Sequence, residues 1–133
     1  PKLDLVLVNP PFSVSTAEVY QNLDLDRVKT HPDLNRMLAA LKSENKSEVI
    51  AALDNLLAEV TMKRYSELDK LKETLLKQGA RKVLMSGSGP TMLGFVDSQL
   101  KAKELAARLE LQFPEDYIIQ PTQTTCQGVI VKN

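Results

Sequence analysis

The stretch KVLMSGSGPTMLGFV, residues 82–96, decides how this chain folds. It holds two short apolar runs separated by six small residues, SGSGPT, and it contains three of the five glycines of the chain. Alternating apolar residues on both sides of a glycine-rich break predict two strands, at 82–85 and 92–96, joined by a loop.

Hydrophobic spacing predicts the elements around this strand pair. A valine- and leucine-rich run predicts a strand at 3–8, which the prolines at 10 and 11 end. Helical spacing and cap residues predict helices at about 16–21, from 34 onwards, through 49–60, at about 63–78 and at about 99–111. The runs DYIIQPT (116–122) and CQGVIVK (126–132) predict one or two final strands.

The order is therefore strand, several helices, strand, strand, helix, strand. It predicts an α+β fold, a ferredoxin-like βαββαβ sandwich with extra helices inserted after the first strand and with the helices on one face of the sheet. No linker, repeat or low-complexity tract divides the 133 residues, so we expect one domain over 1–133.

Composition argues against several functional classes. The 17 basic and 17 acidic side chains cancel, which disfavours a nucleic-acid partner. No run approaches the about 18 apolar residues of a membrane span. Cys126 and His31 are the only residues of their types, which excludes an internal disulfide and argues against a zinc site. We expect a cytoplasmic domain, with Cys126 buried in a strand and His31 solvated in a polar loop.

The loop SGSGPT matches neither common phosphate-binding motif. Walker A requires a lysine after its second glycine, and the dinucleotide fingerprint requires a glycine where Met92 stands. Glycines nevertheless permit a positive φ and can bring successive N–H groups against an anion, while the serine and threonine hydroxyls add donors. Two interpretations stay open: an anion- or ligand-binding loop, and a decorated hairpin turn. No paired carboxylates are spaced for acid–base catalysis, so we predict no catalytic residue and no metal ligand.

The segment LMSGSGPTMLGFV (84–96) resembles the third conserved motif of the GHMP kinases, a superfamily of small-molecule kinases. The segment LVLVNPPFSVSTAEVYQNLD (5–24) is similar to the family that phosphorylates a hydroxyl of 4-diphosphocytidyl-2-C-methyl-D-erythritol in the non-mevalonate route to isoprenoids. The resemblance covers the whole chain but only the C-terminal half of such kinases. It implies a GHMP kinase C-terminal domain, with ATP and Mg²⁺ used by the complete enzyme and neither bound tightly by this chain.

The resemblance also implies a partner. Family members carry the main ATP-phosphate loop, the catalytic aspartate and its lysine in an N-terminal domain, and nothing here matches these parts. The chain begins at Pro1 rather than methionine. We therefore expect a piece of a longer kinase that is inactive without that domain. The apolar surface between the two domains is expected to include Phe12.

Site residues follow from the same resemblance. Tyr20 matches an aromatic residue that packs on the cytosine ring, although it could instead plug the following loop. Thr16 matches a position near that pocket, or is only a helix N-terminal hydroxyl; for Asn9 and Pro10, turn chemistry is favoured. The phosphate-proximal loop is Ser86, Gly87, Ser88, Gly89, Pro90 and Thr91.

Other functions stay open. A homoserine- or mevalonate-type kinase would have no base to stack on Tyr20. A non-catalytic ferredoxin-like module that binds a metabolite shares the topology, because a fold does not fix a function. RNA binding is disfavoured by an aromatic content of 5% and by the lack of paired aromatics on the expected strands.

Overall fold

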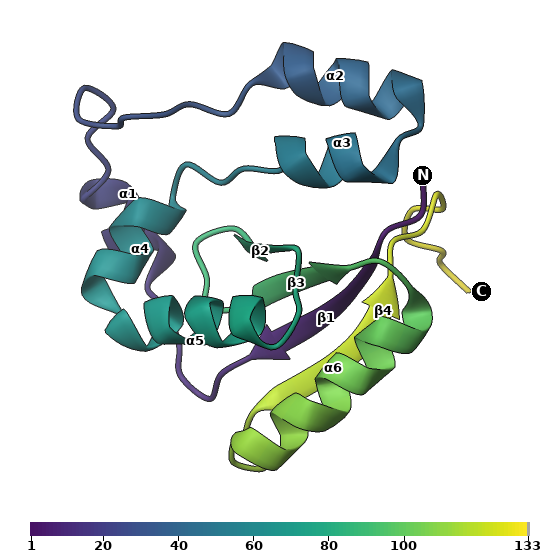
Figure 1. Cartoon of the computed structure of the whole chain (residues 1–133). Coiled ribbons are helices and arrows are strands. Elements are labelled where there is room, and N and C mark those ends of the chain that lie inside the picture. Colours follow the sequence, from purple (N-terminus) through teal and green to yellow (C-terminus); the bar gives the residue numbers. More distant parts are fainter. Residues whose placement is uncertain (133) are drawn as a thin grey trace.

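In the computed structural model, which describes residues 1–132, a four-stranded antiparallel sheet forms the centre of the chain (Figure 1). The strands lie in the order β2-β3-β1-β4, and Leu7 faces Leu93 on one side and Gln120 on the other. This is the strand order of a ferredoxin-like βαββαβ fold, so the predicted fold class is confirmed. The strands are β1 (Asp4–Asn9), β2 (Lys82–Met85), β3 (Met92–Val96) and β4 (Ile118–Gln123).

Six helices accompany the sheet, and four of them lie between β1 and the helix that leads into β2. Side chains cap four of these helices: Ser15, Asp33, Asn45 and Ser98 each accept a hydrogen bond from a backbone N–H of the first turn. The helices are α1 (Thr16–Gln21), α2 (Leu34–Ser43), α3 (Lys46–Ala52), α4 (Ala58–Arg64), α5 (Ser66–Lys77) and α6 (Gln99–Gln112).

Different helices cover the two faces of the sheet. Val6 and Val8 of β1 pack into a core with the buried leucines of α5 and α6. Leu5, on the opposite face of the same strand, packs with Ala40 of α2 and Val49 of α3. The expectation that helices lie on one face is therefore wrong: α2 and α3, inserted after β1, cover part of the second face.

Two expected helices are interrupted. The run 49–60 is helical up to Ala52 and again from Ala58, because the chain leaves the helix at Leu53, which has extended backbone with φ −63° and ψ 133°. The helix expected at 63–78 covers the end of α4 and all of α5, which meet at Tyr65 with φ −123° and ψ 81°. Apolar spacing continues across both interruptions, so periodicity alone did not reveal them.

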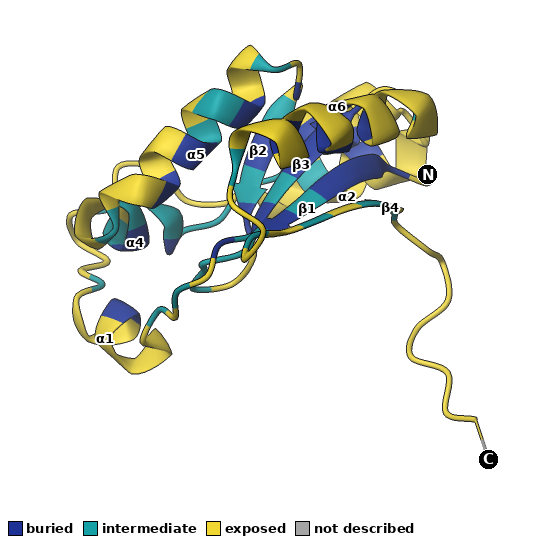
Figure 2. Cartoon of the chain, turned by 90° about the horizontal axis from the view of Figure 1, so that it is seen from below, coloured by how far each residue is buried: buried dark blue, intermediate teal, exposed yellow. Residues whose placement is uncertain are grey.

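The segment after β4 is exposed and forms no strand within residues 124–132 (Figure 2). Only the first of the two expected strand runs is confirmed, because a strand needs a partner and this segment leads away from the sheet (Figure 2). Cys126 is exposed, so the prediction of a buried cysteine in a strand is wrong. Among the described residues, no helix is long and apolar enough to cross a bilayer.

Candidate functional site

The glycine loop, residues 86–91, connects β2 to β3 in a tight turn. Gly87 has φ 55° and Gly89 has φ 88°, the left-handed region that favours glycine. Gly89 N–H donates to the Ser86 carbonyl at 2.9 Å, and Ser86 N–H donates to the Thr91 carbonyl at 2.9 Å. The Gly89–Pro90 peptide bond is cis. Backbone hydrogen bonds thus close the loop, and both glycines suit its conformation.

Two backbone donors of the loop point to no acceptor within residues 1–132. Neither Gly87 N–H nor Ser88 N–H donates a hydrogen bond there. Gly87 is exposed, and a Cβ built at this position meets no atom within 4 Å. Adjacent N–H groups beside open space are able to bind an anion.

Side chains of the preceding helical segment hold the loop in place. Asn55, in the connection between α3 and α4, donates through Nδ2 to the Met85 carbonyl at 2.6 Å and to the Gly87 carbonyl at 2.7 Å. Thr61 of α4 is fully buried and donates through Oγ1 to the Ser88 carbonyl at 3.0 Å. The loop therefore has a fixed shape before any ligand binds.

Sequence reasoning missed Asn55 and Thr61. Asn55 Oδ1 also accepts a hydrogen bond from Leu57 N–H at 2.9 Å, an Asx turn that accompanies the break between α3 and α4. The available signal was the Asp54–Asn55 pair inside an apolar-periodic run, since both residue types favour turns over helix interiors. Thr61 gave no such signal, because a threonine in a helix is ordinary.

Thr16, the first residue of α1, contacts the loop directly. Its Oγ1 lies 2.8 Å from Ser88 Oγ, although the two residues are 72 positions apart. On another side, Thr91 Oγ1 donates to Asn9 Oδ1 at 3.1 Å, at the end of β1. The structure thus brings together Thr16, Asn9 and the glycine loop.

Tyr20 is 58% exposed, whereas Val19 is the buried residue of α1. Thr16 and Tyr20 are four residues apart, so they lie on one face of the helix. This exposure disfavours the interpretation of Tyr20 as a plug. Phe12 is instead half-buried and stacks on Tyr65 with ring centroids 5.7 Å apart, so it contributes little to an exposed apolar surface.

A comparison with protein-family models shows to which family this chain belongs. The family model described as GHMP kinases C terminal matches residues 37–115, which is more than half of the chain. The chain belongs to the GHMP kinase C-terminal family. The resemblance carried by the glycine loop is therefore confirmed.

Curated relatives of this GHMP domain are longer kinases. The 4-diphosphocytidyl-2-C-methyl-D-erythritol kinase of Geobacillus kaustophilus (strain HTA426) is 46% identical over 93 residues, covering 70% of this chain and 32% of the relative. The enzyme of the same name from Clostridium kluyveri (strain ATCC 8527) is 40% identical over 114 residues, covering 86% of this chain and 41% of the relative. The chain thus spans less than half the length of these relatives.

Solved structures share the fold. A crystal structure of 4-(cytidine 5'-diphospho)-2C-methyl-D-erythritol kinase superposes with a TM-score of 0.71 at 22% identity, covering 91% of this chain and 43% of that one. A homoserine kinase from Cytophaga hutchinsonii superposes with a TM-score of 0.66 at 19% identity, covering 92% of this chain and 41% of that one. At these identities the superpositions show the fold alone.

The glycine loop of this GHMP domain offers donors rather than reactive groups. Residues 86–91 supply backbone N–H groups and hydroxyls and contain no charged side chain. Within residues 1–132, no cluster of three histidine, cysteine or acidic residues is arranged to hold a metal ion. The arrangement is therefore suited to binding and orienting an anionic ligand, not to proton transfer.

Proposed function

We propose that the chain is the C-terminal, substrate-side domain of an ATP-dependent kinase that phosphorylates a hydroxyl of 4-diphosphocytidyl-2-C-methyl-D-erythritol. The 2.8 Å contact between Thr16 and Ser88 carries the proposal, because it joins the helix that presents Tyr20 to the glycine loop. A substrate in which a base is attached to phosphates needs one surface for the base and an adjacent surface for the phosphates. The names of relatives at 40% and 46% identity support this substrate over homoserine.

In this proposal the residues of the chain bind and orient. The exposed Tyr20 ring stacks on the cytosine base, and the Gly87 and Ser88 N–H groups donate to phosphate oxygens. The hydrogen-bonded pair of Thr16 and Ser88 hydroxyls joins these two sites, and the one hydroxyl hydrogen that this bond leaves free donates to an intervening oxygen. The absence of another acceptor for the Gly87 and Ser88 N–H groups within residues 1–132 supports this assignment to a phosphate. In the complete enzyme, ATP with Mg²⁺ supplies the phosphoryl group.

We infer that the partner of this domain is an N-terminal domain that carries the main ATP loop, the catalytic groups and the Mg²⁺ ligands. The shares of 32% and 41% of the relatives' length support this inference. The lack of a charged side chain in residues 86–91 supports it as well, since phosphoryl transfer requires charge neutralisation. A cytoplasmic location belongs to the same proposal.

Steady-state kinetics of the complete enzyme test the function. We expect ATP-dependent phosphorylation of the cytidine-linked substrate and none of homoserine. Tyr20→Ala should raise KM by an amount equivalent to about 1–3 kcal/mol of lost stacking, whereas Tyr20→Phe keeps the ring and should keep KM. Turnover of homoserine, or an unchanged KM in the alanine variant, would contradict the proposal.

A further inference from the structure

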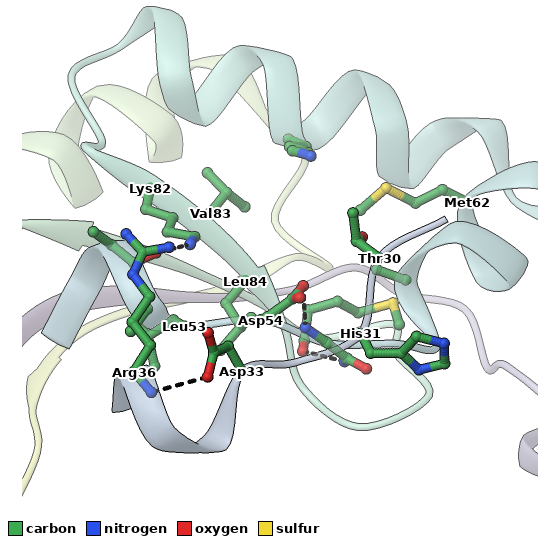
Figure 3. Close-up of a pocket in the computed structure, with 16 residues that line it drawn as sticks. Thr30, His31, Asp33, Arg36, Leu53, Asp54, Met62, Lys82, Val83 and Leu84 are labelled. Atoms are coloured by element: carbon green, nitrogen blue, oxygen red, sulfur yellow. Dashed lines mark hydrogen bonds between the residues drawn. The ribbon is translucent and has the colours of Figure 1, made fainter. Parts of the chain in front are cut away.

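A cavity of about 430 Å³ lies at the free edge of the sheet, along β2 (Figure 3). Its walls come from the segment before α2, the first turn of α2, the α3–α4 connection, β2, and α5 through Lys72. None of the glycine-loop residues 86–91 lines it. The volume lies within the range of small-molecule sites, about 300–1,000 Å³.

Three cationic side chains line this cavity: Arg36, Lys72 and Lys82. The nitrogen-bearing ends of Arg36 and Lys82 approach one another in Figure 3. Burial lowers the pKa of the Lys82 ammonium, and the charges of Arg36 and Lys72 lower it further, against an opposing effect of Asp54. Arg36 and Lys72 are thus each close enough to Lys82 to repel its ammonium group.

No carboxylate forms an ion pair with these three cations within residues 1–132. The two acidic side chains of the wall are engaged by the backbone. Asp33 accepts from Arg36 N–H at 2.9 Å as the cap of α2, and Asp54 accepts from Asn55 N–H at 2.8 Å. These two carboxylates offset part of the positive charge of the cavity without pairing with a cation, and three cations against two carboxylates leave its lining with a net charge of +1.

A hydrogen bond to the backbone fixes the position of the Lys82 ammonium group at the cavity wall. Its Nζ donates to the Ala51 carbonyl at 2.9 Å, near the end of α3. An ammonium group has three donors, so two remain for a ligand. The guanidinium of Arg36 adds a fork of donors that matches paired oxygens of a phosphate.

We propose that this cavity binds a small anion that carries a phosphate or diphosphate group. The group contacts Arg36, Lys72 and Lys82, and the apolar remainder of the ligand packs against Met62 and Leu84 at the cavity wall. The site is separate from the glycine loop but adjoins its base, because Asn55 lines the cavity and also holds the Gly87 carbonyl.

Titration of the chain with inorganic pyrophosphate, followed by NMR and calorimetry, tests this site. We expect saturable binding that shifts the Asn55 side-chain amide and the backbone amides of Val83 and Leu84. Arg36→Gln and Lys72→Gln should each weaken binding about tenfold, the effect of losing one charged hydrogen bond. Lys70→Gln is the matched control, because it removes the same charge from α5 at an exposed position outside the cavity.

The glycine loop is a competing site for pyrophosphate, and the position of the shifted backbone amides separates the two. If the cavity binds the anion, the Val83 and Leu84 amides shift, whereas those of Gly87 and Ser88 stay unchanged, and Arg36→Gln weakens the binding. Shifts confined to residues 86–91, equal weakening by Lys70→Gln and Lys72→Gln, or no saturation would each overturn the proposal. Because Arg36 is exposed and Lys72 half-buried, both variants should keep the dispersed spectrum of the folded chain.

Discussion

Gly87 and Gly89 both have a positive φ, but their surroundings differ. A Cβ at position 89 would lie 3.1 Å from Met85 Sδ and 3.3 Å from Thr61 Cγ2, in a conformation with φ 88°. At position 87, φ is 55° and no atom lies within 4 Å of the added carbon. Gly89 therefore lets the loop pack on the core, whereas a side chain at position 87 would have room.

We accordingly expect Gly89→Ala to lower the free energy of unfolding by more than Gly87→Ala does. The second variant should lose only about 1–2 kcal/mol, the cost of left-handed backbone at a residue with a side chain. Urea denaturation of the two variants measures the difference. Equal losses would mean that Met85 and Thr61 yield at no cost, contrary to the packing described here.

Asn55 is the side chain that joins the α3–α4 connection to the glycine loop, and its removal should be costly. Asn55→Ala breaks the hydrogen bonds to the Met85 and Gly87 carbonyls, so we expect a loss of about 1–3 kcal/mol of unfolding free energy. Asn55→Asp keeps the acceptor for Leu57 N–H but cannot donate when ionised. It should therefore be no more stable than the alanine variant; near-native stability would show that the donated bonds are unimportant.

At the scale of elements, the sequence predicted what is local and missed what is distant. The strands at 82–85 and 92–96 and the short helix at 16–21 are confirmed to the residue, because glycine, proline and cap residues mark their ends. The interruption between α3 and α4 was missed although the Asp54–Asn55 pair is a local turn signal, because the apolar spacing continues across it. The contact between Thr16 and the glycine loop was not predicted, since no local pattern indicates a contact across 72 positions; the family resemblance placed Thr16 only near the pocket of Tyr20.

The carboxylate of Asp97, between β3 and α6, binds one basic side chain just before β2 and another in α6. Asp97 accepts hydrogen bonds from Arg81 Nη1 at 2.8 Å and from Lys101 Nζ at 3.3 Å. These hydrogen bonds, that from Arg81 first, lower the pKa of Asp97 below its usual value of 3.8. The ionised carboxylate therefore stabilises the folded chain above pH 3.8, and this contribution is lost as the pH falls through the folded-state pKa.

Asp97→Asn tests this junction. The variant should unfold at a slightly lower temperature than the parent chain at neutral pH, because exposed ion pairs contribute little. The difference should shrink as the pH falls below 3.8 and vanish once the parent carboxyl is protonated in both states. Thermal melts of both proteins across this pH range give the comparison. A difference that persists in acid would assign the effect to packing rather than to charge.

At the scale of the whole molecule, the candidate site lies at one end of the sheet. β1 ends at Asn9, β2 ends at Met85 and β3 begins at Met92, so the glycine loop and the start of α1 meet there. Two apolar clusters, one on each face, stabilise the sheet behind this end. The molecule therefore presents hydroxyl and N–H donors on a well-packed support, with no acid or base within the loop.

We expect such an end to bind and orient a substrate without itself transferring a phosphoryl group. Transfer requires a positioned ATP, a metal ion and a group that orients the attacking hydroxyl, and we assign all three to the N-terminal domain. We therefore expect the purified chain to show no ATP-dependent phosphorylation of the cytidine-linked substrate, measured by phosphorus NMR of the products. The complete enzyme, assayed in parallel, is the positive control. Turnover by the chain alone, abolished by Ser88→Ala, would locate the chemistry in the glycine loop and refute its assignment to another domain.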